Sequence, residues 1–133
     1  MPTTEFDPFK ESARQRAVSK LELYSRGEYT TLISEYTKDL ELSNVPVAAQ
    51  IRALDIRAAT WEKIGGVANL ELALQDARMM IQLSKAHTAG YLRAGDIFEL
   101  LNQDNSALDI YADGMRQLKP DSLDFEVSAH YYK

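Results

Sequence analysis

A pattern of paired apolar segments repeats along this chain and constrains its fold more than any other feature. Three stretches align at a glycine or polar break: KLELYSRGEYTTLISEYTKDLEL, RAATWEKIGGVANLELALQDARMMIQL and RAGDIFELLNQDNSALDIYADGMRQL. A bulky residue precedes each break, and the equivalent positions Ala73 and Ala107 lie 34 residues apart. A period of this length with two helices per unit indicates stacked helical hairpins, because one hairpin cannot bury its own apolar face.

Residue types that begin and end helices predict about seven helices and no strand. Asp7-Pro8 is a favourable start, because Asp accepts from free N–H groups and Pro tolerates the first helical turn. Asn69 is the expected cap of the fourth helix. The expected helices cover about 8–26, 28–42, 46–64, 69–83, 88–101, 105–118 and 121–132.

The predicted architecture is a single all-α domain over residues 1–133. It contains three helix-turn-helix repeats, at about 11–44, 46–84 and 88–120, and a capping helix at about 121–132. Hydrophobic residues make up 45% and charged residues 26% of the chain, which is typical of a globular protein with a real core.

The third unit alternates small and large residues, which predicts close helix packing. Its glycines do not suggest a phosphate loop, because Gly95 falls inside a helix and no Gly-Lys-Ser/Thr follows. Small residues can serve as holes for large ones where antiparallel helices approach closely. The predicted holes are Ala94, Gly95 and Ala107, and the predicted knobs are Tyr91, Phe98 and Tyr111.

From Glu11 to Pro120 the three units resemble tetratricopeptide (TPR) repeats, with knobs, holes and breaks in order. The resemblance implies a superhelix of hairpins with a concave face lined by the first helix of each. Two residues depart from the pattern: Lys20 stands where a small residue is usual, and Leu32 where alanine is usual. We therefore expect the first pair of helices to pack less tightly.

A narrower resemblance rests on GYLRAGDIFELLNQDNSALDIYADGM, GEYTTLISEYTKDLELS and RAATWEKIGGVANLELALQDARMMIQL. These segments are similar to repeats of fungal F-box proteins that carry an N-terminal TPR domain, an F-box and leucine-rich repeats. The resemblance implies the targeting domain of an SCF ubiquitin-ligase receptor, which tethers the ligase to replication-fork (replisome) proteins. No F-box is recognised here, so the chain corresponds at most to the N-terminal module.

The alternative is a generic TPR adaptor or co-chaperone scaffold that binds a partner peptide or helix in its concave groove.

The chain contains no cysteine, which favours an intracellular protein. The F-box resemblance implies the nucleus, and the generic alternative implies the cytoplasm.

The TPR resemblance places partner binding on the first helix of each hairpin. The family's clamp for Glu-Glu-Val-Asp chaperone tails uses two lysines, two asparagines and a further basic residue. The matching positions here hold Ala17, Leu21, Ile56, Ala89 and Arg93. One arginine cannot replace five donors around a carboxylate, so chaperone tails are not expected partners. The predicted partner-binding residues are Arg14, Leu21, Tyr24, Arg52, Asp55, Ile56, Glu62, Ala89, Leu92, Arg93 and Asp96.

Charge and motif content argue against other function classes. A net charge of −5 disfavours direct nucleic-acid binding and docking on anionic membranes. The isolated histidines His87 and His130 predict no metal site, and no nucleophile–base arrangement or cofactor motif is recognised. We therefore expect neither an enzyme nor a cofactor.

The remaining charged pairs have simple structural interpretations. Arg52 with Asp55, and Arg93 with Asp96, are spaced three apart and are expected to be solvent-exposed pairs within one helix. Trp61 occupies a knob position and is expected in the core. The neighbouring carboxylates are expected on solvated helix faces: Glu35, Asp39, Glu71 and Asp76.

Overall fold

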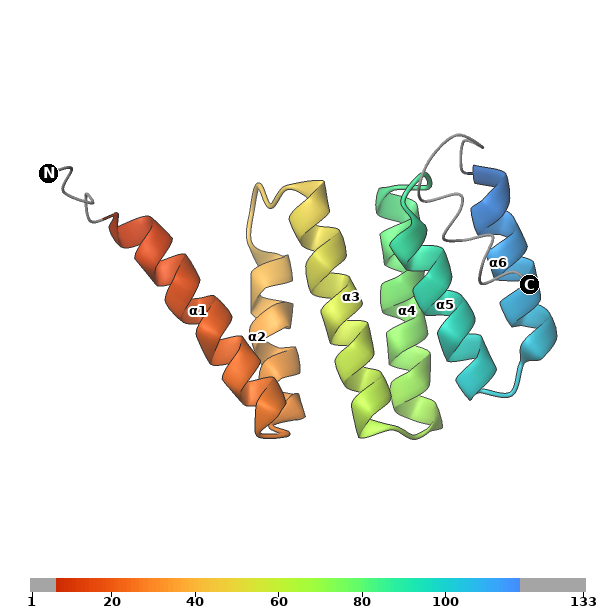
Figure 1. Cartoon of the computed structure of the whole chain (residues 1–133), viewed down its shortest axis with the longest axis horizontal. Helices are drawn as coiled ribbons and strands as arrows, with labels where there is room; N and C mark the ends of the chain where they lie inside the picture. Colours follow the sequence, from red (N-terminus) through yellow and green to blue (C-terminus); the bar gives the residue numbers. More distant parts are fainter. Residues whose placement is uncertain (1–6, 118–133) are drawn as a thin grey trace, which may run out of the picture.

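Six α-helices in a row make up the part of the chain that the computed structural model describes, residues 7–117 (Figure 1). They are α1 (Pro8–Ser25), α2 (Tyr29–Glu41), α3 (Val47–Ile64), α4 (Val67–Leu83), α5 (Thr88–Leu100) and α6 (Asp104–Gln117). No strand occurs in this range, so the all-α prediction is confirmed. None of these helices is both long and apolar enough to cross a bilayer. The predicted capping helix lies outside the described residues.

The turn between α3 and α4 corrects one predicted boundary. Gly65 and Gly66 both have positive φ angles, 80° and 90°, and α4 begins directly after them at Val67. Asn69 therefore lies within the first turn of α4, where its side-chain amide donates to the Gly65 carbonyl at 2.7 Å. The prediction of Asn69 as a cap was wrong, because the paired glycines reverse the chain earlier.

Small residues occupy the crossings of α3, α4 and α5. Ala58, Ala73, Ala77 and Ala94 are each at most 1% exposed. Because alanine projects only a methyl group, the helix axes can approach closely while larger side chains fill the flanking space. Trp61 packs against the cluster that these alanines form, which confirms its place in the core.

The contact between α5 and α6 pairs glycines with buried tyrosines. A side chain at Gly95 would overlap the ring of Tyr111, and a Cβ atom at Gly114 would lie 2.9 Å from Cβ and Cγ of Tyr91. The Tyr111 hydroxyl donates to Asp96 at 2.8 Å, which holds the ring in place. The prediction that Gly95 is a hole and Tyr111 a knob is confirmed.

A partly buried guanidinium joins α2, α3 and α4. Arg57 on α3 donates through Nε and Nη2 to both carboxylate oxygens of Asp76 on α4, at 2.9 and 2.6 Å. Its Nη1 donates to Oγ1 of Thr37 on α2 at 3.1 Å. Asp76 is only 4% exposed, so its expected place on a solvated face was wrong. The reason is that α3 supplies a bidentate partner from across the helix interface.

The helix α1 stands apart from the rest. Among the described helices it contacts α2 alone, whereas α3 contacts α2, α4 and α5. Figure 1 shows the N-terminal part of α1 leaning away from the row. Lys20 lies between α1 and α2, with its ammonium group paired with Asp39 and 4.6 Å from the centre of the Tyr36 ring. The expected looser packing of the first pair is confirmed.

Replacing Gly95 by alanine is expected to lower the free energy of unfolding by about 1–3 kcal/mol, although alanine is the better helix former. The added methyl overlaps the Tyr111 ring, which its hydrogen bond to Asp96 holds in place. Urea unfolding followed by circular dichroism measures the change. In a Tyr111→Leu background the same substitution should cost less, because the ring is gone. A stabilising Gly95→Ala change would contradict the packing described.

Replacing Asp76 by leucine is expected to destabilise the fold by about 3 kcal/mol, because Arg57 is left charged and unpaired in a largely buried site. The double change Arg57→Met with Asp76→Leu should recover most of that loss. Glu71→Leu, at an exposed position of the same helix, should change stability by less than about 0.5 kcal/mol. Equal effects of Asp76→Leu and Glu71→Leu in urea unfolding would rule out a structural role for the pair.

Candidate functional site

A cleft of about 800 Å³ opens where α1 and α3 separate. Its walls come from α1 and α3, and its floor comes from α2 and the loop that follows α2. We call this the α1–α3 cleft. It is lined by Arg16, Lys20, Leu21, Tyr24, Leu32, Tyr36, Asp39, Leu40, Leu42, Val45, Ala49, Arg52, Ala53 and Ile56.

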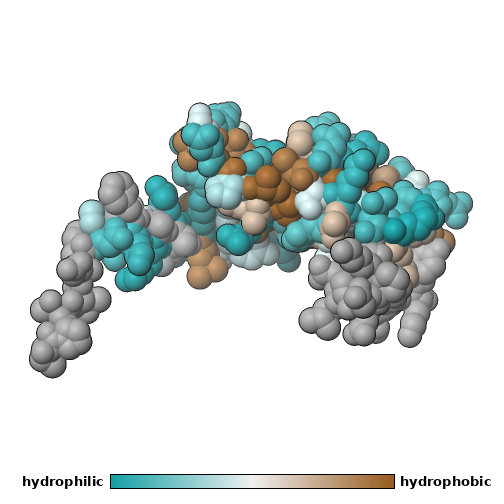
Figure 2. All heavy atoms as spheres, turned by 90° about the horizontal axis from the view of Figure 1, so that it is seen from above, coloured by the Kyte–Doolittle hydropathy of each residue, from teal (hydrophilic) through white to brown (hydrophobic). Residues whose placement is uncertain are grey.

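Most of the cleft lining is apolar and part of it is open to solvent. Leu21 is 67% exposed, and Tyr24 lies edge-on to Tyr29 with ring centres 5.7 Å apart. Seen from above, hydrophobic side chains gather over the middle of the row, while the α1 end of the molecule is largely hydrophilic (Figure 2). Exposed apolar side chains that gather in a concave site are typical of a binding surface.

The charged groups of the α1–α3 cleft are mainly basic. Arg16 and Arg52 are exposed and form no hydrogen bond or ion pair with residues 7–117. Lys20 is neutralised by Asp39. Burial raises the pKa of the Tyr36 hydroxyl, and the nearby Asp39 carboxylate raises it further. The two arginines are therefore the charges that the cleft offers to a partner.

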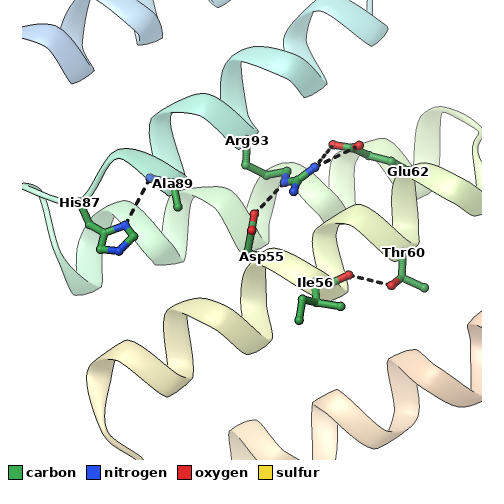
Figure 3. A network of polar contacts seen from close by, with 7 residues as sticks. All are labelled: Asp55, Ile56, Thr60, Glu62, His87, Ala89 and Arg93. Atoms are coloured by element: carbon green, nitrogen blue, oxygen red, sulfur yellow. Dashed lines mark hydrogen bonds and ion pairs between the residues drawn. The ribbon is translucent and has the colours of Figure 1, made fainter. Parts of the chain in front are cut away.

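A second group of charges joins α3 to α5 (Figure 3). Nε of Arg93 donates to Oδ1 of Asp55 at 2.8 Å, and Nη1 lies 3.4 Å from each carboxylate oxygen of Glu62. Burial raises the pKa of Glu62, and Asp96 and Asp55 add to the rise, while Arg93 opposes it. Burial lowers the pKa of Arg93, but Asp55 and Glu62 outweigh this and raise it overall.

These contacts overturn the expectation of ion pairs within single helices. Arg93 bonds across to α3, and Asp96 instead accepts from the Tyr111 hydroxyl of α6. Asp55 is the partner of Arg93 and not of Arg52. Spacing along one helix could not reveal this, because the nearest opposite charge lies on the neighbouring helix.

Seven of the eleven predicted binding residues fall into two groups. Four of them line the α1–α3 cleft: Leu21, Tyr24, Arg52 and Ile56. Three converge in the ion-pair cluster between α3 and α5: Asp55, Glu62 and Arg93. The charged groups of this cluster bind one another, so the cleft is the better candidate for recognition of a partner.

The other four predicted residues lie elsewhere. Arg14 pairs with Glu11 on its own helix at 3.3 Å and does not line the cleft. Ala89 packs against the core cluster of Ile51, Leu54 and Met80. The remaining two are on α5, where Leu92 is partly buried and Asp96 is bonded to α6.

Sequence reasoning missed the cleft floor, because it mapped only the first helix of each hairpin. The floor includes Leu40 at the end of α2 and Val45 in the following loop. These residues become accessible because α1 does not pack on α3. Lys20 and Leu32 were the sequence features that could have indicated the cleft. Each stands where TPR repeats usually have a small residue, and a small residue would let α1 and α2 pack closely.

No group of three histidine, aspartate or glutamate side chains within residues 7–117 is placed to hold a metal ion. His87 has a local role, since its Nδ1 accepts from the Ala89 amide at 3.3 Å at the start of α5 (Figure 3).

The arrangement of helical hairpins is that of the TPR fold. The chain superposes on the first TPR domain of Spaghetti (RPAP3), solved with the HSP90 peptide SRMEEVD, with a TM-score of 0.59 and 16% identity. The likeness covers 85% of this chain and 86% of that one. The chain thus has the TPR fold, as its repeats predicted.

Two curated proteins are similar in sequence. Protein DIA2 of Eremothecium gossypii is 41% identical over 64 residues, which is 48% of this chain. The F-box/TPR repeat protein pof3 of Schizosaccharomyces pombe is 31% identical over 94 residues, which is 71% of this chain. The matched segments span only 9% and 15% of those proteins. No protein-family model matches the chain.

Replacing Arg93 by glutamine is expected to raise the pKa of Glu62 further, because the guanidinium is the neighbour that lowers it. A carboxyl whose folded pKa lies above its unfolded value adds stability at acid pH, and loses that stability as the pH rises through the folded pKa. The variant should therefore lose more stability than the wild type between acid and neutral pH.

Carbon-13 NMR titration of the Glu62 carboxyl and urea unfolding at several pH values measure both effects. Arg78→Gln is the matched control, because Arg78 is exposed on α4 and forms no ion pair with the described residues. A Glu62 pKa that is unchanged or lower in Arg93→Gln would contradict the assigned contacts.

Proposed function

We propose that this chain is a non-catalytic protein-interaction module that holds a partner segment in its concave face. The observation that carries the proposal is the α1–α3 cleft, where exposed apolar side chains lie beside Arg16 and Arg52, which have no partner within residues 7–117. Apolar anchors with a few directing charges are the usual composition of a peptide- or helix-binding groove.

A co-chaperone role that depends on a carboxylate clamp is disfavoured. The solved TPR domain of RPAP3 is bound to an HSP90 peptide. Of the five clamp positions here only Arg93 is basic, and Asp55 and Glu62 already bind its guanidinium. A carboxylate tail would have to displace those two acids, which stand close enough to repel it.

We propose further that the chain is the N-terminal targeting domain of an F-box receptor in an SCF ubiquitin ligase, and that it tethers the ligase to replisome proteins in the nucleus. Its similarity to a protein named F-box/TPR repeat protein and to Protein DIA2 supports this assignment. A generic TPR adaptor remains the alternative. The two differ in whether the gene encodes an F-box beyond this segment.

A pull-down with purified replisome components tests the proposal. The immobilised domain is expected to retain at least one component, and Arg52→Glu should weaken retention about tenfold by reversing a free cleft charge. Arg78→Glu is the control, because it makes the same change on α4, outside the cleft.

Arg52→Glu is preferred to a change at Arg93, which would place a third acid beside Asp55 and Glu62 and disturb the fold. Retention of no replisome component by the wild-type domain would reject the targeting role. Equal retention by the wild type, Arg52→Glu and Arg78→Glu would show that the partner binds outside the cleft.

A further inference from the structure

We propose that the α1–α3 cleft takes an amphipathic α-helix of the partner, with an apolar ridge flanked by acidic side chains. This inference rests on the proposed function and specifies the partner's chemistry. It follows from three features of the cleft: its size, its lack of amide and hydroxyl side chains apart from tyrosine, and its free charges.

The cleft is large enough for a row of side chains. Its volume of about 800 Å³ falls within the range of sites that hold drug-sized ligands. Leu21 stands on the α1 wall and Ile56 on the α3 wall, with Leu40 between them on α2. Such a trough suits the apolar residues of one helix face, spaced three and four apart.

The polar groups of the lining favour a helix over an extended segment. Among the described residues, no asparagine, glutamine, serine or threonine lines the cleft. The Val45 carbonyl, in the loop at the floor, already accepts from the Gln50 side chain at 2.7 Å. An extended segment would bury backbone N–H groups with few acceptors here, because the free arginines only donate, whereas a helix satisfies most of its N–H groups internally.

The free charges select acidic flanks. Arg16 projects from α1 and Arg52 from α3, and neither is paired with a described residue. A carboxylate on either side of the apolar ridge gains a charge-assisted hydrogen bond, and a lysine there is repelled. Further along the concave face two carboxylates, Asp55 and Glu62, surround the single guanidinium of Arg93, which leaves a net negative charge there. The preference for acidic partner residues is therefore confined to the cleft.

Selection from a displayed library tests this inference. The library contains 18-residue helices with a fixed leucine ridge and flanking positions drawn from Glu, Gln and Lys. A parallel library carries a central proline, which breaks the helix. Panning on the full chain should enrich Glu-flanked helices and should not enrich the proline library.

The best enriched peptide should bind Arg52→Glu and Leu21→Glu at least about tenfold more weakly than the wild type in fluorescence anisotropy. The matched controls are Arg78→Glu on α4 and Leu108→Glu on α6, where the exposed leucine lies outside the cleft. Circular dichroism verifies that all four variants fold. Enrichment of Lys or proline sequences, no enrichment, or equal losses in the controls would overturn the inference.

The two proposals fail separately. If a replisome component is retained but no acidic helix binds the cleft, the targeting role stands and the helix-binding cleft is rejected. If the acidic helices bind the cleft but no replisome component is retained, the cleft stands and the targeting role is rejected.

Discussion

Close approach of consecutive helices at small residues sets the geometry of the whole array. Ala58, Ala73, Ala77 and Ala94 are almost completely buried, and Gly95 leaves room for the Tyr111 ring. Each hairpin from α3 onward can therefore bury its apolar face on its neighbour. Where this constraint is relaxed, at the first pair, α1 contacts α2 but not α3, and the cleft opens.

Three arginines illustrate how tertiary position decides the role of a charge. Arg57 is partly buried, binds Asp76 and Thr37, and joins α2, α3 and α4. Arg93 bridges two first helices on the concave face. Arg52 lies on the cleft rim without a partner among the described residues, which leaves its full bonding capacity for another molecule.

The fold was predictable because its signals are local. Breaks at Gly27 and Gly65, and the alternation of small and large residues around Gly95, are properties of neighbouring residues in the chain. The ion pairs were not predictable, because Arg57 and Arg93 find partners on other helices. A spacing of three or four residues shows which side chains share a helix face, but not what that face meets.

The amino-acid sequence by itself determined the helical hairpins, their repeat, the small residues that pack them and the weakness of the first pair, since these depend on helix propensity and residue size. Only the tertiary structure decided which predicted residues form a site. In it Asp55, Glu62 and Arg93 bind one another, whereas Leu21 and Arg52 line the cleft and stay accessible. The physical reason is that the separation of α1 from α3 is set by how α1 packs on α2 and how α2 packs on α3, and these are contacts between residues far apart in the sequence.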